Sequence, residues 1–251
     1  MCGIGGIYLP DETSRWLPRM ELSFLWEGLE NRGTHACGFA VQWKDADAPV
    51  VMKWPHTATK HIDSLETLAS GSNVRYAMLH TRYATQGNVS RSANNHPVVI
   101  HRMLVTHNGV LRDWRQIFKT LRIHRRFDVD TEAINAALRL KSPSWTIENV
   151  HGSMSLAWVD LDEPEKVHLM TNGQNPLVIG RLTTGQIVWA STDWHLEDAF
   201  GDLLERGFHA LPFKQYTLSP DGSIRSHWLS KRRSEAHLGL MPHPASWRKL
   251  A

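Results

Sequence analysis

The feature that most constrains the fold is a series of short strand-like segments spread along almost the whole chain. Their apolar patterns and the turn-forming residues between them are typical of β-strands, and longer helical patterns alternate with them. The predicted strands are 2–9, 37–43, 49–54, 74–82, 97–107, 153–160, 166–171, 176–180, 186–190 and 213–218, and the predicted helices are 14–30, 60–70, 112–122, 130–141 and 193–205. No repeat or low-complexity linker interrupts them, so we expect a single α+β domain in which two sheets pack together with helices outside.

The composition is that of a globular protein large enough to bury a core. Of its 251 residues, 41% are hydrophobic and 21% are charged, which excludes an intrinsically disordered chain. Charged side chains interrupt residues 1–30, and no run of about 18 apolar residues occurs, so we expect no signal peptide and no membrane association. Two cysteines, Cys2 and Cys37, are too few for a disulfide framework. We therefore expect a cytoplasmic protein.

Positive charge is concentrated in two segments. Residues 112–126 and residues 223–251 each hold six lysines and arginines against a single acidic residue. Such segments make nucleic acid a candidate partner, but the simpler interpretation, a solvated helix face and a polar tail, is the one we favour. We place the domain at residues 1–222 and treat 223–251 as a basic C-terminal tail.

Cys2 is the residue with the most distinctive chemistry. It follows the initiator methionine, and its side chain is small enough for that methionine to be removed. The new N-terminus would then carry a nucleophilic thiol and an α-amine whose usual pKa of about 7.7–8.0 suits a general base. The alternative is that Cys2 is a small apolar residue at the start of a buried strand.

Six short motifs follow one another along the chain. They are Cys2-Gly3-Ile4, the segment Arg32-Gly33 to Gly38, Thr81 to Thr85 (TRYAT), Asn94 to Pro97 (NNHP), His107-Asn108-Gly109 and Asp130-Thr131-Glu132. Their order and spacing resemble the glutaminase domain of class II, N-terminal-nucleophile glutamine amidotransferases, of the type found in glucosamine-6-phosphate synthase. The resemblance covers about residues 2–218 and implies a four-layer αββα sandwich of the N-terminal-nucleophile hydrolase type.

The resemblance also implies a role for each matched residue. Cys2 would attack the side-chain amide of L-glutamine and form a thioester, while Asn108 and Gly109 would donate hydrogen bonds to the developing oxyanion. The family's remaining substrate contacts fall on Arg82 for the α-carboxylate, Asp130 for the α-ammonium, and Thr85 and His96. Taken alone, Asn108-Gly109 would predict a tight turn and Asp130 a helix N-cap.

Three positions depart from the family pattern. Tyr83 stands where a tryptophan is usual, Gln86 where a histidine is usual, and His35 replaces an acidic residue. These changes put the closure of the loop over glutamine in doubt and leave the thiol chemistry untouched. We expect Cys37 to be a buried small residue, because a disulfide with Cys2 would destroy the nucleophile.

The sequence offers no sign of a metal or a cofactor. Its fifteen histidines include no zinc-binding spacing, and neither a dinucleotide-binding nor a phosphate-binding glycine motif is complete. No acceptor domain is visible either, so the leading hypothesis is a glutaminase that delivers ammonia to a separate synthase or transferase. The alternatives are a γ-glutamyl amide hydrolase of the same fold and a catalytically silent binding module.

Overall fold

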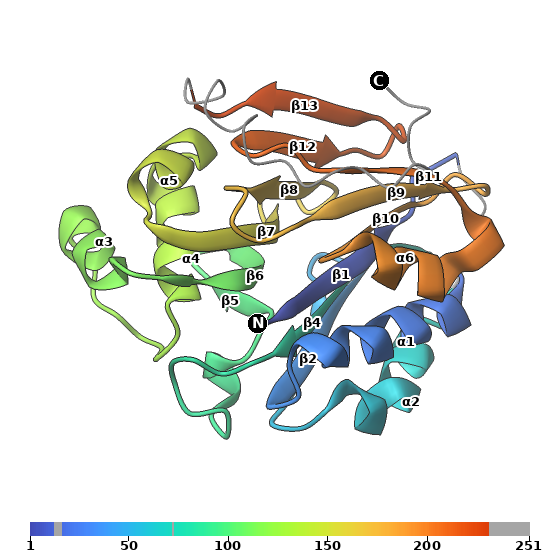
Figure 1. The fold of residues 1–251 in the computed structure, drawn as a ribbon, viewed down its shortest axis with the longest axis horizontal. Coiled ribbons are helices and arrows are strands. Elements are labelled where there is room, and N and C mark those ends of the chain that lie inside the picture. Colours follow the sequence, from blue (N-terminus) through green and yellow to red (C-terminus); the bar gives the residue numbers. More distant parts are fainter. Residues whose placement is uncertain (13–16, 72, 231–251) are drawn as a thin grey trace.

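The computed structural model describes residues 1–12, 17–71 and 73–230, which form two antiparallel sheets with helices on their outer faces (Figure 1). The first sheet has the order β11-β9-β10-β1-β4-β2-β3, and the second has the order β13-β12-β8-β7-β6-β5. The strands of the first sheet are β1 (Gly3–Tyr8), β2 (Ala36–Trp43), β3 (Val50–Trp54), β4 (Val74–Arg82), β9 (Val178–Leu182), β10 (Ile187–Ala190) and β11 (Leu204–His209). The strands of the second are β5 (Val98–Ile100), β6 (Met103–Leu111), β7 (Gly152–Asp160), β8 (Val167–Thr171), β12 (Lys214–Leu218) and β13 (Ile224–Trp228).

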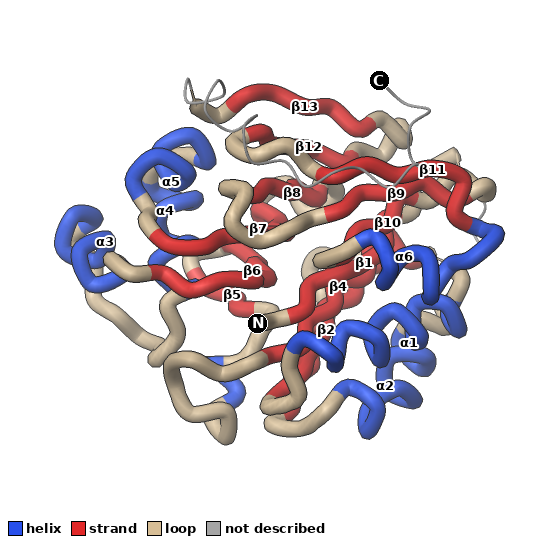
Figure 2. The backbone as a smooth tube through the Cα atoms, viewed as in Figure 1, coloured by secondary structure: helices blue, strands red, loops and turns tan. Residues whose placement is uncertain are grey.

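Helices cover the outer face of each sheet, so the predicted α+β class and the four-layer αββα arrangement are confirmed (Figure 2). The helices on the first sheet are α1 (Arg19–Gly28), α2 (Ile62–Leu68) and α6 (Asp193–Phe200), and those on the second are α3 (Trp114–Leu121), α4 (Thr131–Leu140) and α5 (Pro143–Asn149). Short 3-10 turns are η1 (Leu29–Arg32), η2 (Ala58–His61), η3 (Ser92–Asn94) and η4 (Gly201–Leu203). Within the described residues, no helix is long and apolar enough to cross a membrane.

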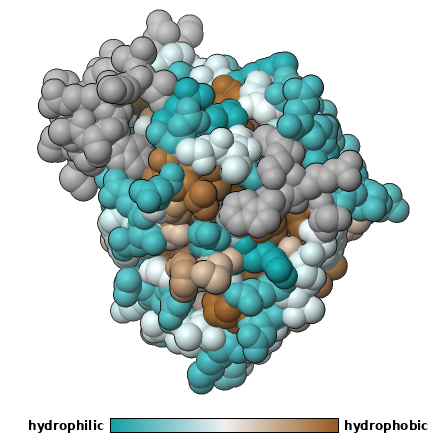
Figure 3. All heavy atoms as spheres, turned by 90° about the vertical axis from the view of Figure 1, so that its right-hand side faces the viewer, coloured by the Kyte–Doolittle hydropathy of each residue, from teal (hydrophilic) through white to brown (hydrophobic). Residues whose placement is uncertain are grey.

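The core follows this layering. One apolar cluster joins α1, α2 and α6 to the first sheet, a second fills the space between the sheets, and a third lies between the second sheet and α3, α4 and α5. The cluster between the sheets includes Ile4, Tyr8, Met78 and Leu104, all fully buried. Figure 3 shows the side of the molecule that carries α1 and α6. The surface there is mostly hydrophilic, with only separated apolar areas.

Strand β1 lies at the centre of the first sheet, between β10 and β4. Its glycines suit tight packing: a Cβ on Gly6 would lie 2.3 Å from the Trp189 ring and 2.4 Å from the Ala77 carbonyl oxygen. In the antiparallel register with β4, Gly3 is opposite Thr81. The start of β1 and the end of β4 therefore meet at one edge of the sheet, which brings Cys2 next to Arg82.

Most predicted elements are present, with these differences. The predicted helix 14–30 begins at Arg19 as α1, and its predicted start at 14–16 lies outside the described residues. The predicted strand 97–107 is a hairpin of β5 and β6, because His101 and Arg102 both have positive φ and form a two-residue turn. The predicted helix 193–205 ends at Phe200, and the residues that follow form η4 and the edge strand β11. Helix α5 was not predicted, although Pro143 begins it and the Ser142 side chain accepts a hydrogen bond from the Trp145 N–H.

The second sheet extends past the predicted domain boundary at residue 222. Ile224–Trp228 pairs with β12 as the edge strand β13, so the start of the predicted basic tail is part of the sheet. The remainder of that tail, 231–251, lies outside the described residues.

Candidate active site

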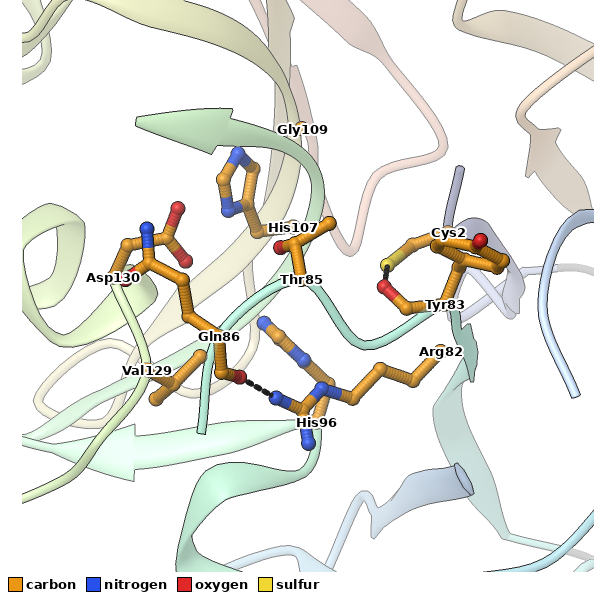
Figure 4. Close-up of a pocket in the computed structure, with 10 residues that line it drawn as sticks. All are labelled: Cys2, Arg82, Tyr83, Thr85, Gln86, His96, His107, Gly109, Val129 and Asp130. Carbon is orange, nitrogen blue, oxygen red and sulfur yellow. Dashed lines mark hydrogen bonds between the residues drawn. The ribbon is translucent and has the colours of Figure 1, made fainter. Parts of the chain in front are cut away.

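A pocket lies where the two sheets meet, at the start of β1, and its lining residues come from five separate parts of the chain (Figure 4). They are Cys2, Arg82, Tyr83, Thr85, Gln86, His96, His107, Gly109, Val129 and Asp130. The structure thus brings together six of the seven site residues that the sequence predicted. The seventh, Asn108, does not line the pocket and is buried on β6 next to Gly109. Sequence reasoning did not name four of the lining residues as site residues: Tyr83 and His107, which belong to matched motifs, and Gln86 and Val129, which stand directly beside matched motifs.

Alternation along the strands explains which side chains face the space between the sheets. Ile4 on β1, Met78 on β4 and Leu104 on β6 belong to the apolar cluster there. Successive side chains of a strand point to opposite faces, so Cys2, two residues before Ile4, and Asn108, four residues after Leu104, face the same inter-sheet layer. Arg82, four residues after Met78, does so as well.

The Cys2 thiol is held at the edge of this layer. Its Sγ lies 3.7 Å from the Tyr83 carbonyl oxygen, to which the S–H donates, and the Cys2 carbonyl oxygen accepts a hydrogen bond of 2.9 Å from Arg32 Nε. Burial raises the pKa of the Cys2 thiol, although the nearby Arg82 charge acts in the opposite direction. The thiol is therefore protonated at rest and needs a base to become a nucleophile.

Arg82 brings an unpaired positive charge to the pocket. Its guanidinium donates to the backbone oxygen of Gln86 (Figure 4), to Asn95 Oδ1 at 2.7 Å and to the backbone oxygen of Gly87, and all three acceptors are neutral. Among the described residues it forms no ion pair. Burial lowers its pKa, but an arginine in this environment remains charged. Such a group suits a carboxylate from outside the protein.

Asp130 brings the opposite charge from the second sheet's side. It occupies the N-cap position of α4, yet its side chain makes no cap hydrogen bond, and Oδ2 instead accepts from the Leu111 N–H at 2.8 Å. The side chain is therefore not used as the helix cap that the sequence left open as an alternative. No ion pair involves Asp130 in the described residues, so one carboxylate oxygen is available to a cationic group.

Gly109 is tightly packed at the pocket, and its neighbour Asn108 has a side chain without hydrogen-bond partners among the described residues. A Cβ on Gly109 would lie 1.9 Å from the Ser153 carbonyl oxygen and 2.5 Å from His107 Nε2, so only glycine fits there. Asn108 is fully buried, and neither its side-chain oxygen nor its nitrogen has a hydrogen-bond partner among the described residues. Buried amides are normally hydrogen-bonded, so this one is a donor left free.

Three buried histidines connect the two sheets behind the pocket. His80 Nε2 donates to the His107 carbonyl oxygen at 3.1 Å, and the His80 and His96 rings stack with centroids 4.1 Å apart. His107 Nε2 donates to the Ser153 carbonyl oxygen, so the neutral ring accepts at Nδ1 from the Thr131 hydroxyl, which accepts in turn from His96 Nε2. Burial lowers the pKa of all three, that of His80 to about 3, and keeps them neutral.

The loop after β4 carries two of the three departures from the family pattern. Tyr83 is half exposed, and its ring stacks on His35 with centroids 4.8 Å apart. His35 Nδ1 also accepts a hydrogen bond of 3.0 Å from the Ala84 N–H. His35 thus anchors the loop through an imidazole, in a place where an acidic residue was expected.

Neither cysteine is in a disulfide, and the two differ in their surroundings. Cys37 lies on β2 in the helix-side core, the apolar cluster between the first sheet and helices α1, α2 and α6. Burial there raises its pKa to about 12. No group of three or more potential metal ligands is present in the part of the chain that the structure describes.

Comparison with known proteins relates the chain to one group of enzymes. It is 30% identical to the glutamine–fructose-6-phosphate aminotransferase (isomerizing) of Shouchella clausii over 192 residues, 72% of this chain and 30% of that one. It is 28% identical to the enzyme of the same name from Chlamydia muridarum, over 78% of this chain and 32% of that one. The chain therefore spans about a third of the length of these curated relatives. No family model matches it.

Solved structures agree on the fold. The glutamine phosphoribosylpyrophosphate amidotransferase of B. subtilis matches 92% of this chain and 50% of its own with a TM-score of 0.70 and 20% identity. A glutamine aminotransferase class-II domain protein from Silicibacter pomeroyi matches over its full length with a TM-score of 0.52 and 14% identity. None of these relatives is named as a nucleic-acid-binding protein, so the nucleic-acid partner considered from the charge distribution has no support here.

Proposed function

Because this chain belongs to the class II, N-terminal-nucleophile glutamine amidotransferase domains, we propose that it hydrolyses the side-chain amide of L-glutamine and supplies the ammonia to a separate acceptor enzyme. The observation that carries this proposal is the pocket itself. A thiol, a cation without an acidic partner and a carboxylate without a basic partner converge there from β1, β4 and the start of α4. Free glutamine has an electrophilic amide, an α-carboxylate and an α-ammonium, and so complements all three.

The reaction begins when the thiol loses its proton. Met1 is 67% exposed and precedes a small residue, so its removal would leave an α-amine on Cys2 itself. That amine takes the thiol proton, and the sulfur attacks the amide carbon. The tetrahedral intermediate collapses with transfer of a proton to the leaving nitrogen, which releases ammonia and leaves a γ-glutamyl thioester. Water then hydrolyses the thioester to glutamate and restores the thiol.

The second sheet's side of the pocket would stabilise the intermediate. Negative charge develops on the amide oxygen, and the Gly109 N–H together with the free Asn108 side-chain amide would donate to it. Arg82 and Asp130 would hold the α-carboxylate and the α-ammonium, with Thr85 and His96 as further contacts. The neutral state of His96 and His107 avoids a competing positive charge near Arg82.

The test is product analysis with the purified protein. We expect glutamate and ammonia in equal amounts from L-glutamine, an intact mass without Met1, and labelling of the N-terminal peptide by a glutamine-like diazo-ketone. If protein that has lost Met1 releases no glutamate from L-glutamine, the proposal is wrong. A higher kcat/KM for another γ-glutamyl amide than for glutamine would favour the amide hydrolase instead.

Delivery to a partner needs its own experiment, because the matched part of each relative is only about a third of that relative's length. The acceptor would be a synthase or transferase that consumes ammonia. Adding the candidate acceptor enzyme with its substrate should convert the glutamine nitrogen into the aminated product, and free ammonia should fall by the same amount. If the release of free ammonia is unchanged, the protein is a glutaminase that does not deliver ammonia to that acceptor.

A further inference from the structure

Among the described residues, Asn175 is the one whose side chain forms a hydrogen bond to the peptide group between Asn108 and Gly109. Its Nδ2 donates to the Asn108 carbonyl oxygen at 2.9 Å, and both residues are buried. Asn175 lies 67 residues further along the chain, four residues after the end of β8. We propose that Asn175 is a positioning residue that aims the Gly109 N–H at the oxyanion; this inference rests on the proposed function.

Peptide geometry provides the first step of the argument. The carbonyl of Asn108 and the N–H of Gly109 belong to one planar trans peptide, in which they point in opposite directions. A hydrogen bond that holds the oxygen therefore also fixes the direction of the N–H. Polarisation of the carbonyl by the same hydrogen bond makes the N–H a stronger donor.

Close packing provides the second step. The backbone of Gly109 lies so near to Ser153 on β7 that a Cβ would meet the Ser153 carbonyl oxygen at 1.9 Å. That contact limits movement of the peptide on one side, and Asn175 holds it at the carbonyl. The Asn108 side chain is attached to the same stretch of backbone. Both proposed oxyanion donors therefore depend on how the Asn108–Gly109 peptide is held.

Asn175 is itself held by two buried hydroxyl groups. Ser155 Oγ and Thr171 Oγ1 lie 2.7 Å and 2.8 Å from the Asn175 carbonyl oxygen, and the two hydroxyls are 2.9 Å apart. Ser155 is opposite Asn108 in the β6–β7 register and opposite Thr171 in the β7–β8 register. The network therefore runs across three strands to the proposed oxyanion hole, and every member is at most 4% exposed.

The chain offers a matched control in the same loop. Asn172 is partly buried, donates from Nδ2 to the Gly152 carbonyl oxygen at 2.7 Å, and forms no hydrogen bond with the Asn108–Gly109 peptide. The substitutions Asn175→Asp and Asn172→Asp each remove an amide donor with little change in shape. Thermal unfolding of both variants shows whether any loss at Asn175 exceeds a general loss of stability.

We expect Asn175→Asp to lower kcat by about tenfold to a hundredfold, less than the ~10²–10³ that follows loss of a direct oxyanion donor. The glutamine KM should stay close to that of the wild type. Affinity for glutamate γ-semialdehyde, which forms a tetrahedral thiohemiacetal with the thiol, should fall by the same factor as kcat/KM. A protonated carboxyl can donate again, so the activity of Asn175→Asp relative to the wild type should rise as the pH falls.

A second readout does not depend on turnover. The amide resonance of Gly109 should shift in Asn175→Asp and stay in place in Asn172→Asp. If the wild type does not hydrolyse glutamine, the proposed function fails, while this resonance still tests the positioning. An unmoved Gly109 resonance, or equal losses of kcat in the two variants, would overturn the inference.

Discussion

The two halves of the pocket are built differently. On the first sheet, Cys2 and Arg82 are neighbours because β1 and β4 are paired with Gly3 opposite Thr81. On the second side, Gly109 lies on β6 and Asp130 at the start of α4, and Asp130 Oδ2 is tied to the Leu111 N–H. Strand register alone thus sets the thiol next to the cation, whereas the distance from the thiol to the proposed oxyanion donors depends on how the sheets pack. Changes in either half should therefore have different consequences.

The largest expected effect separates the two thiols of the first sheet. Cys2→Ala should abolish glutamine hydrolysis, because no other thiol lines the pocket. Cys37→Ala should retain it, since Cys37 lies in the helix-side core with a pKa of about 12. Glutamate release and diazo-ketone labelling of both variants provide the measurement. Equal losses of activity would mean that the nucleophile is misassigned.

The next effect compares the charged groups of the two halves. Arg82→Lys and Asp130→Asn should each raise the glutamine KM strongly, because loss of a buried charged partner costs on the order of 2–5 kcal/mol. A lysine retains the charge of Arg82 but not its two-pronged geometry, so it should not restore binding. Initial rates over a range of glutamine concentrations measure the effect. An Arg82→Lys enzyme with the wild-type KM would exclude Arg82 as the carboxylate contact.

Sequence reasoning succeeded where a local pattern decides the structure. Strand and helix periodicity placed most elements, and the order of the motifs indicated residues that the fold then gathers in one pocket. It missed the hairpin at His101 and Arg102, because positive φ at two residues other than glycine leaves no compositional sign. It also missed β11, whose polar edge sequence is not strand-like. It missed α5 as well, although Ser142-Pro143 is a helix-start pattern that could have indicated it.

Long-range packing explains the remaining omissions. Asn175 belongs to no motif, and only the register of β7 and β8 brings it to Asn108. The charge states of the pocket could not be predicted either. His80, His96 and His107 carry no sign of neutrality in the sequence, and burial between the sheets lowers their pKa.

These histidines make the junction of the sheets sensitive to acid. The pKa of His80 is about 3 in the folded protein against an ordinary value of 6.5, so below pH 6.5 the unfolded chain binds more protons than the folded one. The stability that neutral His80 contributes is fully present above pH 6.5 and is lost as the pH falls towards 3. At about pH 5 the loss is about 2 kcal/mol for one such histidine.

Urea unfolding at about pH 7.5 and about pH 5 measures this loss. His80→Gln retains a donor for the His107 carbonyl oxygen and does not titrate, so the stability difference between the two pH values should shrink by about 2 kcal/mol. His96 and His107 should keep part of the dependence, because burial lowers their pKa as well. An undiminished difference in His80→Gln would show that this ring is not the group that titrates.

The smallest effect on catalysis is expected at the positive surface of helix α3, which follows β6 in the chain. Helix α3 packs Trp114, Ile117 and Phe118 inward and exposes Arg115, Lys119 and, just after it, Arg122. No ion pair involves these three cations in the described part of the chain.

The triple change Arg115→Glu, Lys119→Glu and Arg122→Glu should leave kcat and KM for glutamine unchanged, because none of the three lines the pocket. We expect it to weaken binding to an acidic surface of the acceptor enzyme, and the wild-type affinity should fall as salt is added. Equal affinity and equal salt dependence for both proteins would instead identify this surface as a solvated helix face.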